Sequence, residues 1–141
     1  MKNRRVLIID DEPDVRRYHE TLLSDRGWSV ASASSAAEGL RMARKNPPDL
    51  VLLDLMMPER GGLSTLVELR KDDRLRSVRI VIVTGIDQEV RNIYGKEEHY
   101  DASLRRFKKF RADAYLEKPV DPEELLTTLE GLLVPAGAEE L

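Results

Sequence analysis

No cysteine occurs among the 141 residues of this sequence. Disulfide bonds and thiolate metal sites are therefore excluded, and the composition is compatible with a reducing cytosol. Long hydrophobic runs are also missing, because the longest have four to six residues, whereas a transmembrane helix needs about 20. The apolar stretch after Arg5 is likewise too short for a secretory signal. We therefore expect a cytoplasmic protein that does not engage a membrane.

An excess of charge of one sign is missing too. Lysine and arginine number 23, and aspartate and glutamate number 26. The net charge of −3 gives no reason to expect a nucleic-acid partner. The composition, 41% hydrophobic and 35% charged, is ordinary for a globular chain. Because no repeat, linker or low-complexity segment is present, we expect one domain over residues 1–134 and a tail over 135–141.

Short apolar runs predict the strands. Three of them, at 6–9, 50–55 and 80–83, are rich in valine, leucine and isoleucine and are continuous rather than alternating. Such runs are typical of strands that are buried on both faces of a parallel sheet. Weaker strand candidates lie at 28–31 and 114–116.

Helical patterns lie between these runs. The predicted helices run from Pro13 to about Arg26 (closed by Gly27), from a cap at Ser34 or Ser35 to just before Pro47, and from Leu63, after Gly61-Gly62, through Leu69. Two more are predicted within 87–110 and from Asp121 to Leu133. In the helix that begins at Pro13 we expect Val15, Tyr18, Leu22 and Leu23 to form the buried stripe. The β–α alternation predicts a parallel sheet with helices on both faces.

Polar residues stand at the carboxyl ends of four of the five predicted strands. Asp10 and Asp11 follow the first strand, Asp54 lies near the end of the third, Thr84 ends the fourth, and Lys118 follows the fifth. In open parallel sheets, ligands bind outside the carboxyl ends of the strands. We therefore expect these side chains to converge on one binding site.

The residue types indicate the chemistry of this site. Three neighbouring carboxylates repel one another unless a cation lies between them. Oxygen ligands without histidine or cysteine favour Mg²⁺, and a lysine beside a hydroxyl group is suited to a phosphoryl group. A carboxylate can itself attack phosphorus to give an acyl phosphate. The pattern therefore predicts a site for Mg²⁺ and a phosphoryl group with a nucleophilic aspartate.

At these residues the chain resembles the receiver domains of bacterial response regulators. The matching motifs are Val6-Leu7-Ile8-Ile9-Asp10-Asp11-Glu12, Leu52-Leu53-Asp54-Leu55-Met56-Met57-Pro58, Gly62, Val83-Thr84-Gly85 and Tyr115-Leu116-Glu117-Lys118-Pro119. Each motif alone is moderately specific, whereas all five in this order are a strong signal. The resemblance implies a flavodoxin-like α/β fold, in which a doubly wound five-stranded parallel sheet has the strand order 2-1-3-4-5.

The resemblance also implies a role for each site residue. Asp54 accepts a phosphoryl group from a phosphohistidine on a histidine kinase or a histidine phosphotransfer protein. Asp10 or Asp11, of which Asp11 is the more direct ligand in the family, holds Mg²⁺ together with Asp54 and the backbone carbonyl of Met56. The protein would then phosphorylate and dephosphorylate itself as a switch rather than turn over a substrate.

Further residues would transmit the phosphorylation. By resemblance, Lys118 pairs with the phosphoryl oxygens and precedes a cis bond to Pro119. Thr84 moves toward the phosphoryl group and Tyr115 swings inward, which alters the face of the fourth helix, fifth strand and fifth helix. In the family, that face serves output and can form a homodimer.

The chain departs from the family pattern in one segment. Lys118 follows Thr84 by 34 residues, about a dozen more than in a typical receiver. The surplus lies within 87–110, and Arg111 replaces the usual glycine. We therefore expect an extended fourth-helix region and a changed output face. The basic stretch at 105–111 is interpreted as a solvated helix face, and His19 and His99 as surface residues.

Two other functions stay open at this point. A degenerate receiver would serve only as a binding scaffold, although no acidic site residue is missing. A haloacid-dehalogenase-like phosphatase also uses a nucleophilic aspartate and Mg²⁺ on a parallel sheet. That enzyme would need an Asp-x-Asp motif, where this chain has Glu12, and a cap domain, for which the chain is too short.

Two apolar residues near the predicted site lead to a prediction about the phosphorylated form. Met56 stands two residues after Asp54, and Ile86 two residues after Thr84. Because polar groups at these positions can orient the hydrolytic water in receiver domains, we expect the phosphorylated protein to be comparatively long-lived. Phosphate release in the presence of Mg²⁺ measures this lifetime, and a lifetime of seconds would contradict the prediction.

Overall fold

The computed structural model describes residues 4–55, 57, 62–85 and 112–133. Its elements are β1 (Arg5–Ile9), α1 (Pro13–Asp25), β2 (Ser29–Ala33), α2 (Ala36–Lys45), β3 (Leu50–Asp54), α3 (Gly62–Lys71), β4 (Arg79–Thr84), β5 (Ala114–Glu117) and α6 (Pro122–Leu133). The strands form one sheet of order β2-β1-β3-β4-β5, and every neighbouring pair is parallel. The predicted doubly wound five-stranded sheet is therefore confirmed.

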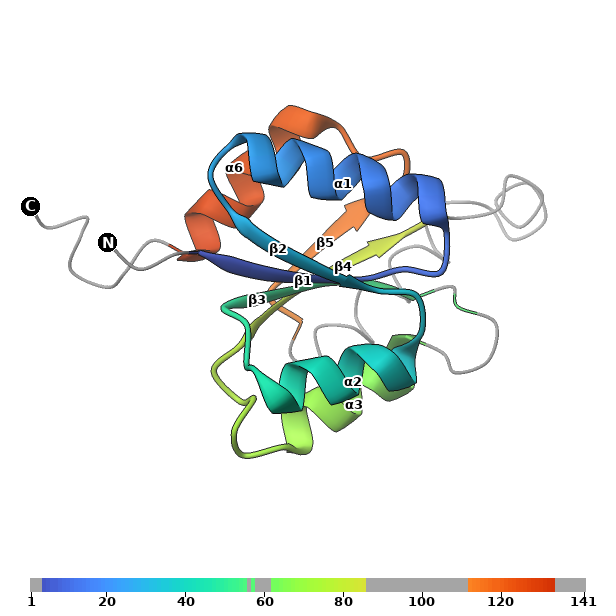
Figure 1. The fold of residues 1–141 in the computed structure, drawn as a ribbon, viewed down its shortest axis with the longest axis vertical. Coiled ribbons are helices and arrows are strands. Elements are labelled where there is room, and N and C mark those ends of the chain that lie inside the picture. The colour runs from blue at the N-terminus through green and yellow to red at the C-terminus, as the bar shows by residue number, and fades with distance from the viewer. Residues whose placement is uncertain (1–3, 56, 58–61, 86–111, 134–141) are drawn as a thin grey trace, which may run out of the picture.

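The sheet is covered on both faces. Figure 1 shows α1 and α6 on one face and α2 and α3 on the other. Alternate residues of β1 pack in opposite directions: Leu7 and Ile9 join the apolar cluster under α2 and α3, whereas Val6 and Ile8 join the cluster under α1 and α6. This double burial explains why the strands are continuous apolar runs in the sequence. None of the helices in the described ranges has the length and apolarity to cross a bilayer.

Local signals set the helix ends. Gly27, which follows α1, has a φ of +89°, a conformation that glycine adopts without strain. Of the two serines that could cap α2, Ser35 does so, because its side chain accepts a hydrogen bond from the Glu38 amide at 3.2 Å. At the start of α6, Asp121 accepts a hydrogen bond from the Glu124 amide at 3.1 Å. The predicted starts of these two helices are thus confirmed.

α1 buries a different stripe from the one predicted. Tyr18 is 47% exposed, whereas His19, which we expected on the surface, is only 3% exposed. The helical period explains the difference, because the residue four positions before the buried Leu23 lies on the same face. That residue is His19. The predictions for Tyr18 and His19 are therefore wrong.

The last strand is anchored where it begins. The Asp113 amide donates to the Ile80 carbonyl at 2.8 Å, and Asp113 Oδ2 accepts from the Ile80 amide at 2.8 Å. The same carboxylate pairs with Arg70, near the end of α3, at 2.8 Å. These bonds hold β5 against β4 and thereby determine where the chain after β5 reaches the edge of the sheet.

Several predictions concern residues outside the described ranges. They are the extended helical region at 87–110 with the basic stretch at 105–111, the surface position of His99, the Met56 carbonyl as a Mg²⁺ ligand, and the tail at 135–141. They stay predictions.

The close contact between α2 and β1 predicts the effect of adding one methyl group. A Cβ atom built at Gly39 would lie 2.7 Å from Ile9 Cγ1 and closer still to Cδ1, and Ile9 is fully buried. Overpacking of this kind costs about 1–3 kcal/mol, which exceeds the helix-propensity gain of about 1 kcal/mol. We therefore expect Gly39→Ala to lower the free energy of unfolding in chemical denaturation.

Gly131→Ala in α6 is the matched control, because a Cβ atom there would meet nothing within 4 Å. We expect this variant to gain up to about 1 kcal/mol. Equal stabilisation by both substitutions would show that α2 does not approach β1 as closely as described.

Candidate active site at the carboxyl edge of the sheet

The buried acids of the site lie on neighbouring strands. Ile9 of β1 pairs with Leu53 of β3, so Asp10 and Asp54 occupy the next position on each strand. They are 3% and 2% exposed, and the Asp10 amide donates to the Ala33 carbonyl at 3.1 Å. The main chain therefore holds both carboxylates at the carboxyl edge, as predicted.

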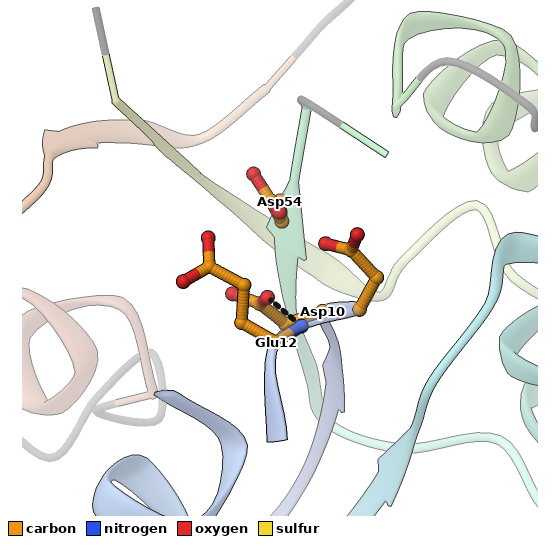
Figure 2. Close-up of side chains that lie close together, drawn as sticks. Asp10, Glu12 and Asp54 are labelled. Carbon is orange, nitrogen blue, oxygen red and sulfur yellow. Dashed lines mark hydrogen bonds between the residues drawn. The ribbon is translucent and has the colours of Figure 1, made fainter. Parts of the chain in front are cut away.

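Two more acids complete an acidic cluster of Asp10, Asp11, Glu12 and Asp54. One carboxylate oxygen from each of the four lies within 4.8 Å of the others. Figure 2 shows Asp10 and Glu12, from the connection between β1 and α1, beside Asp54 from β3. At this spacing four negative charges repel strongly, so a cation or protons must compensate them.

Lys118, which is 108 residues from Asp10 in the sequence, neutralises part of this negative charge. Its Nζ atom lies 2.9 Å from Asp10 Oδ2, 3.4 Å from Glu12 Oε1 and 3.5 Å from Asp54 Oδ2. Burial lowers the pKa of this ammonium group, but the hydrogen bond to Asp10 and the charges of Asp54, Asp10 and Glu12 outweigh burial and raise the pKa. Lys118 is therefore positively charged at neutral pH. The predicted cis bond to Pro119 is confirmed.

The donor set of the cluster fits a hard divalent cation. All of its side-chain donors are carboxylate oxygens, which Mg²⁺ prefers over nitrogen or sulfur. Asp10 and Asp54 are buried at its centre, whereas Asp11 is half-buried and Glu12 exposed. One side is therefore open to water and to a ligand oxygen, as a partly hydrated Mg²⁺ ion requires. Glu12 belongs to the cluster although the sequence predicted only Asp10, Asp11 and Asp54.

The predicted switch residues lie on the neighbouring strand pair. Thr84 is the last residue of β4 and pairs with Glu117, the residue before Lys118. Since Val83 pairs with Asp54, the backbone of Thr84 reaches the edge where the acids lie. Tyr115 on β5 is half-buried and packs against the apolar cluster under α2 and α3. Their backbone positions suit the proposed pair, while the switching movement stays a prediction.

Arg16 is a site residue that the sequence did not indicate. Its Nη1 atom donates to the Asp10 carbonyl at 2.8 Å, and the Glu12 amide donates to Asp10 Oδ1 at 2.9 Å. Together these bonds fix the loop that presents the acids. Glu12 could have been predicted as a site residue, because it directly follows the Asp10–Asp11 pair. Arg16 could not, because no motif in the sequence includes it.

A buried histidine lies beside the site. His19 Nδ1 has no hydrogen-bond partner in the part of the chain that the structure describes. Burial lowers the pKa of the imidazole; the charge of Asp10 opposes this shift and the charge of Lys118 adds to it. His19 also lines a groove of about 510 Å³, whose walls include Glu12, Tyr18 and Lys118. We call this the α1 groove.

Comparisons with known proteins agree with this arrangement. The family model of the response regulator receiver domain matches residues 6–130. Protein PilH of Pseudomonas aeruginosa is 34% identical over 129 residues, which cover 92% of this chain and 97% of PilH. The chemotaxis response regulator CheY4 of Vibrio cholerae has a solved structure that matches with a TM-score of 0.79 at 26% identity, over 94% of this chain and 100% of CheY4.

Longer proteins contain a similar segment. The DNA-binding dual master transcriptional regulator RpaA of Synechocystis is 33% identical over 129 residues, which cover 92% of this chain but 48% of RpaA. The chain therefore spans about half the length of such a regulator.

The lowered pKa of His19 predicts a pH dependence of stability. In the unfolded chain this histidine titrates near its ordinary pKa of about 6.5, so below that pH the unfolded state binds more protons than the folded state. The stability that depends on neutral His19 is fully present above the pKa of the unfolded state, and it is lost as the pH falls toward the lower pKa of the folded state. The slope from one proton is at most about 1.4 kcal/mol per pH unit.

The change of unfolding free energy with pH is measured by denaturant unfolding in EDTA between about pH 7.5 and pH 5.5. This range of about two units spans the pKa of histidine in the unfolded chain. We expect His19→Gln to flatten the slope, because glutamine does not titrate. Tyr18→Phe, at the exposed neighbouring position on α1, is the control and should keep the slope of the parent. Equal slopes in the parent and in His19→Gln would contradict the assignment.

Proposed function

The chain belongs to the response regulator receiver domains of two-component signalling, and on that premise we propose that it is a Mg²⁺-dependent phosphoacceptor whose acceptor residue is Asp54. The observation that carries the proposal is the position of Lys118, whose Nζ atom lies 2.9 Å from Asp10 and 3.5 Å from Asp54. A buried carboxylate beside a fixed ammonium group and further acids is suited to a metal and a phosphoryl group.

Asp54 would act as the nucleophile. One of its carboxylate oxygens attacks the phosphorus atom of a phosphohistidine on a partner histidine kinase or histidine phosphotransfer protein. The phosphorus–nitrogen bond breaks, the imidazole leaves and takes up a proton from solvent, and Asp54 becomes an acyl phosphate. Since phosphoryl transfer proceeds through a loose transition state, the neighbouring residues contribute mainly by positioning and by neutralising charge.

Asp10, Asp11 and Asp54, with the Met56 carbonyl implied by the resemblance, would hold the Mg²⁺ ion. When bound, the ion supplies neutralisation of charge on the phosphoryl oxygens. Lys118 would neutralise charge as well: its ammonium group contacts Asp10, Glu12 and Asp54, and a phosphoryl group on Asp54 would compete for the same ammonium protons. Arg16 keeps the Asp10 carbonyl in place during this exchange.

The same exchange would start the conformational response. Thr84 would donate its hydroxyl group to the new phosphoryl oxygens, and Tyr115 would follow it from β5, next to β4 in the sheet. If Thr84 and Tyr115 have two arrangements, hydrogen bonds that form in only one of them increase the population of that arrangement. The output face would comprise the fourth helix, β5 and α6, where a homodimer could also form. The protein would then act in the cytoplasm as a switch that is limited by its own dephosphorylation.

The α1 groove offers a path for the phosphodonor. It extends from the site residues Glu12 and Lys118 along α1, where it is bordered by the exposed ring of Tyr18. A helix that carries a phosphohistidine could lie in this groove with its imidazole directed at the acidic cluster. Residues 1–134 would form the receiver, and any output domain or target belongs to partners or to a longer chain.

The phosphoacceptor proposal predicts one labelled residue. We expect acetyl phosphate to add one phosphoryl group to the protein in Mg²⁺, observed by intact mass, and we expect EDTA to abolish the addition. Asp54→Asn should reduce labelling to background. Asp73→Asn should not, because Asp73 is 84% exposed in its side chain and lies outside the cluster.

Each alternative has its own outcome. If the parent protein takes no label from any donor and binds no beryllofluoride, the chain is a binding scaffold. Sustained turnover of small phosphate esters would instead favour the phosphatase.

A further inference from the structure

β2 forms an open edge of the sheet. In the described ranges it pairs only with β1. The Ser29 amide donates to the Arg4 carbonyl at 2.7 Å, so the main-chain groups of Ser29 point toward β1. Because these directions alternate along a strand, the N–H and C=O groups of Val30 and Ser32 point to the opposite side, where no described strand lies.

The strand β2 itself lacks three features that commonly protect an edge strand from pairing with other chains. Edge strands normally avoid pairing with other chains through charged side chains, proline or a bulge. β2 reads Ser-Val-Ala-Ser-Ala and contains neither a charge nor a proline. Its five residues pair with β1 in unbroken register, so no bulge interrupts it. The edge can therefore accept another strand.

A groove lies on the α2 side of this edge. It has a volume of about 390 Å³ and runs between the first residues of β1 and β2 and the last turns of α2. Ala33 packs into the cluster under α2, and residues 29 and 31 lie on the same face by alternation. These two side chains, Ser29 and Ala31, are too small to fill the space beneath Met42. The groove is therefore a consequence of the β2 sequence.

The wall of the groove is basic. Arg41 and Lys45, both exposed, are four residues apart on α2, and they make no hydrogen bond or ion pair anywhere in the described ranges. By contrast, Arg44 on the same helix pairs with Asp72 at 3.2 Å. Arg5 adds a third basic side chain, and no lining residue is acidic. Like charges four residues apart weaken a helix slightly, so this pair suits an anionic partner.

We propose that this β2-edge groove binds an extended acidic segment of a partner protein, which adds to the sheet as a sixth strand beside β2. Val30 and Ser32 supply main-chain hydrogen bonds to the segment, as in other cases of strand addition. Alternate side chains of a strand recur on one face about every 6.7 Å, and helical residues four apart are separated by about 6 Å along the axis. Acids at alternate positions of the segment therefore match Arg41 and Lys45.

The groove favours a peptide over a nucleic acid. The open edge presents both donors and acceptors of the main chain, which a peptide backbone satisfies in turn. Single-stranded nucleic acids bind largely by stacking on aromatic rings, and none of the lining residues is aromatic. The surface is independent of the phosphoacceptor proposal, because the groove lies at the first residues of β1 and β2, whereas Asp10 and Asp54 lie at the carboxyl edge of the sheet.

A blocked peptide of alternating valine and glutamate is the probe, and a valine–lysine peptide is its counterpart. Each is titrated into the isotopically labelled full chain and followed by NMR. We expect the glutamate peptide alone to bind and to shift the amide signals of Val30 and Ser32. Arg41→Glu combined with Lys45→Glu should weaken binding by about tenfold, since two attractions become two repulsions.

Two controls separate charge from strand pairing. Arg17→Glu with Lys71→Glu makes the same charge change at exposed residues outside the groove and should leave the affinity within about twofold. Val30→Pro removes an outward N–H group at an edge that tolerates proline and should abolish binding.

Four outcomes would overturn the proposal. They are no binding of the glutamate peptide at millimolar concentration, equal binding of the lysine peptide, unchanged affinity in the Arg41/Lys45 variant, and unchanged affinity in the Val30 variant. Binding of a fluorescent oligothymidylate in place of the peptide, with the same dependence on Arg41 and Lys45, would assign the surface to nucleic acid instead.

Discussion

The crowding of negative charge at the carboxyl edge of the sheet is the constraint on which the rest of the molecule depends. Two unit charges 4 Å apart interact by about 4 kcal/mol at the effective dielectric constant near a protein surface, and four carboxyl groups share this space. Lys118 neutralises one charge only. A divalent cation at the cluster would relieve the remaining repulsion, and a phosphoryl group there would change the balance of charges.

The sheet is what maintains this crowding. Asp10 and Asp54 cannot move apart, because β1 and β3 hold them through main-chain pairing between fully buried apolar residues. The bond from Arg16 to the Asp10 carbonyl restrains the loop on the open side. A receiver thus keeps its acids together with apolar packing and backbone hydrogen bonds, which do not depend on the ionic state of the site.

Much of this could be predicted from the sequence because the signals are local. Continuous apolar runs mark buried strands, and polar residues at their ends mark the site, so the parallel sheet and the positions of Asp10, Asp54 and Lys118 agree with the structure. The strand order, which also agrees, was implied by the family resemblance and not by these local signals. The features that could not be predicted depend on how a helix is rotated about its axis or on where the end of a long side chain lies. His19 and Tyr18 differ by one position on α1, and Arg16 finds its partner only once α1 has packed.

The bonds of Asp113 to β4 and to Arg70 have a consequence for the evolution of the domain. These bonds join Asp113, just before β5, to Ile80 and Arg70, which both precede Gly85 in the chain. The position of Lys118 after β5 therefore does not depend on the length of the chain between 85 and 112. That connection can therefore change in length without moving Lys118 away from Asp10. Lineages can thus acquire new partners at one end of the sheet without having to rebuild the other.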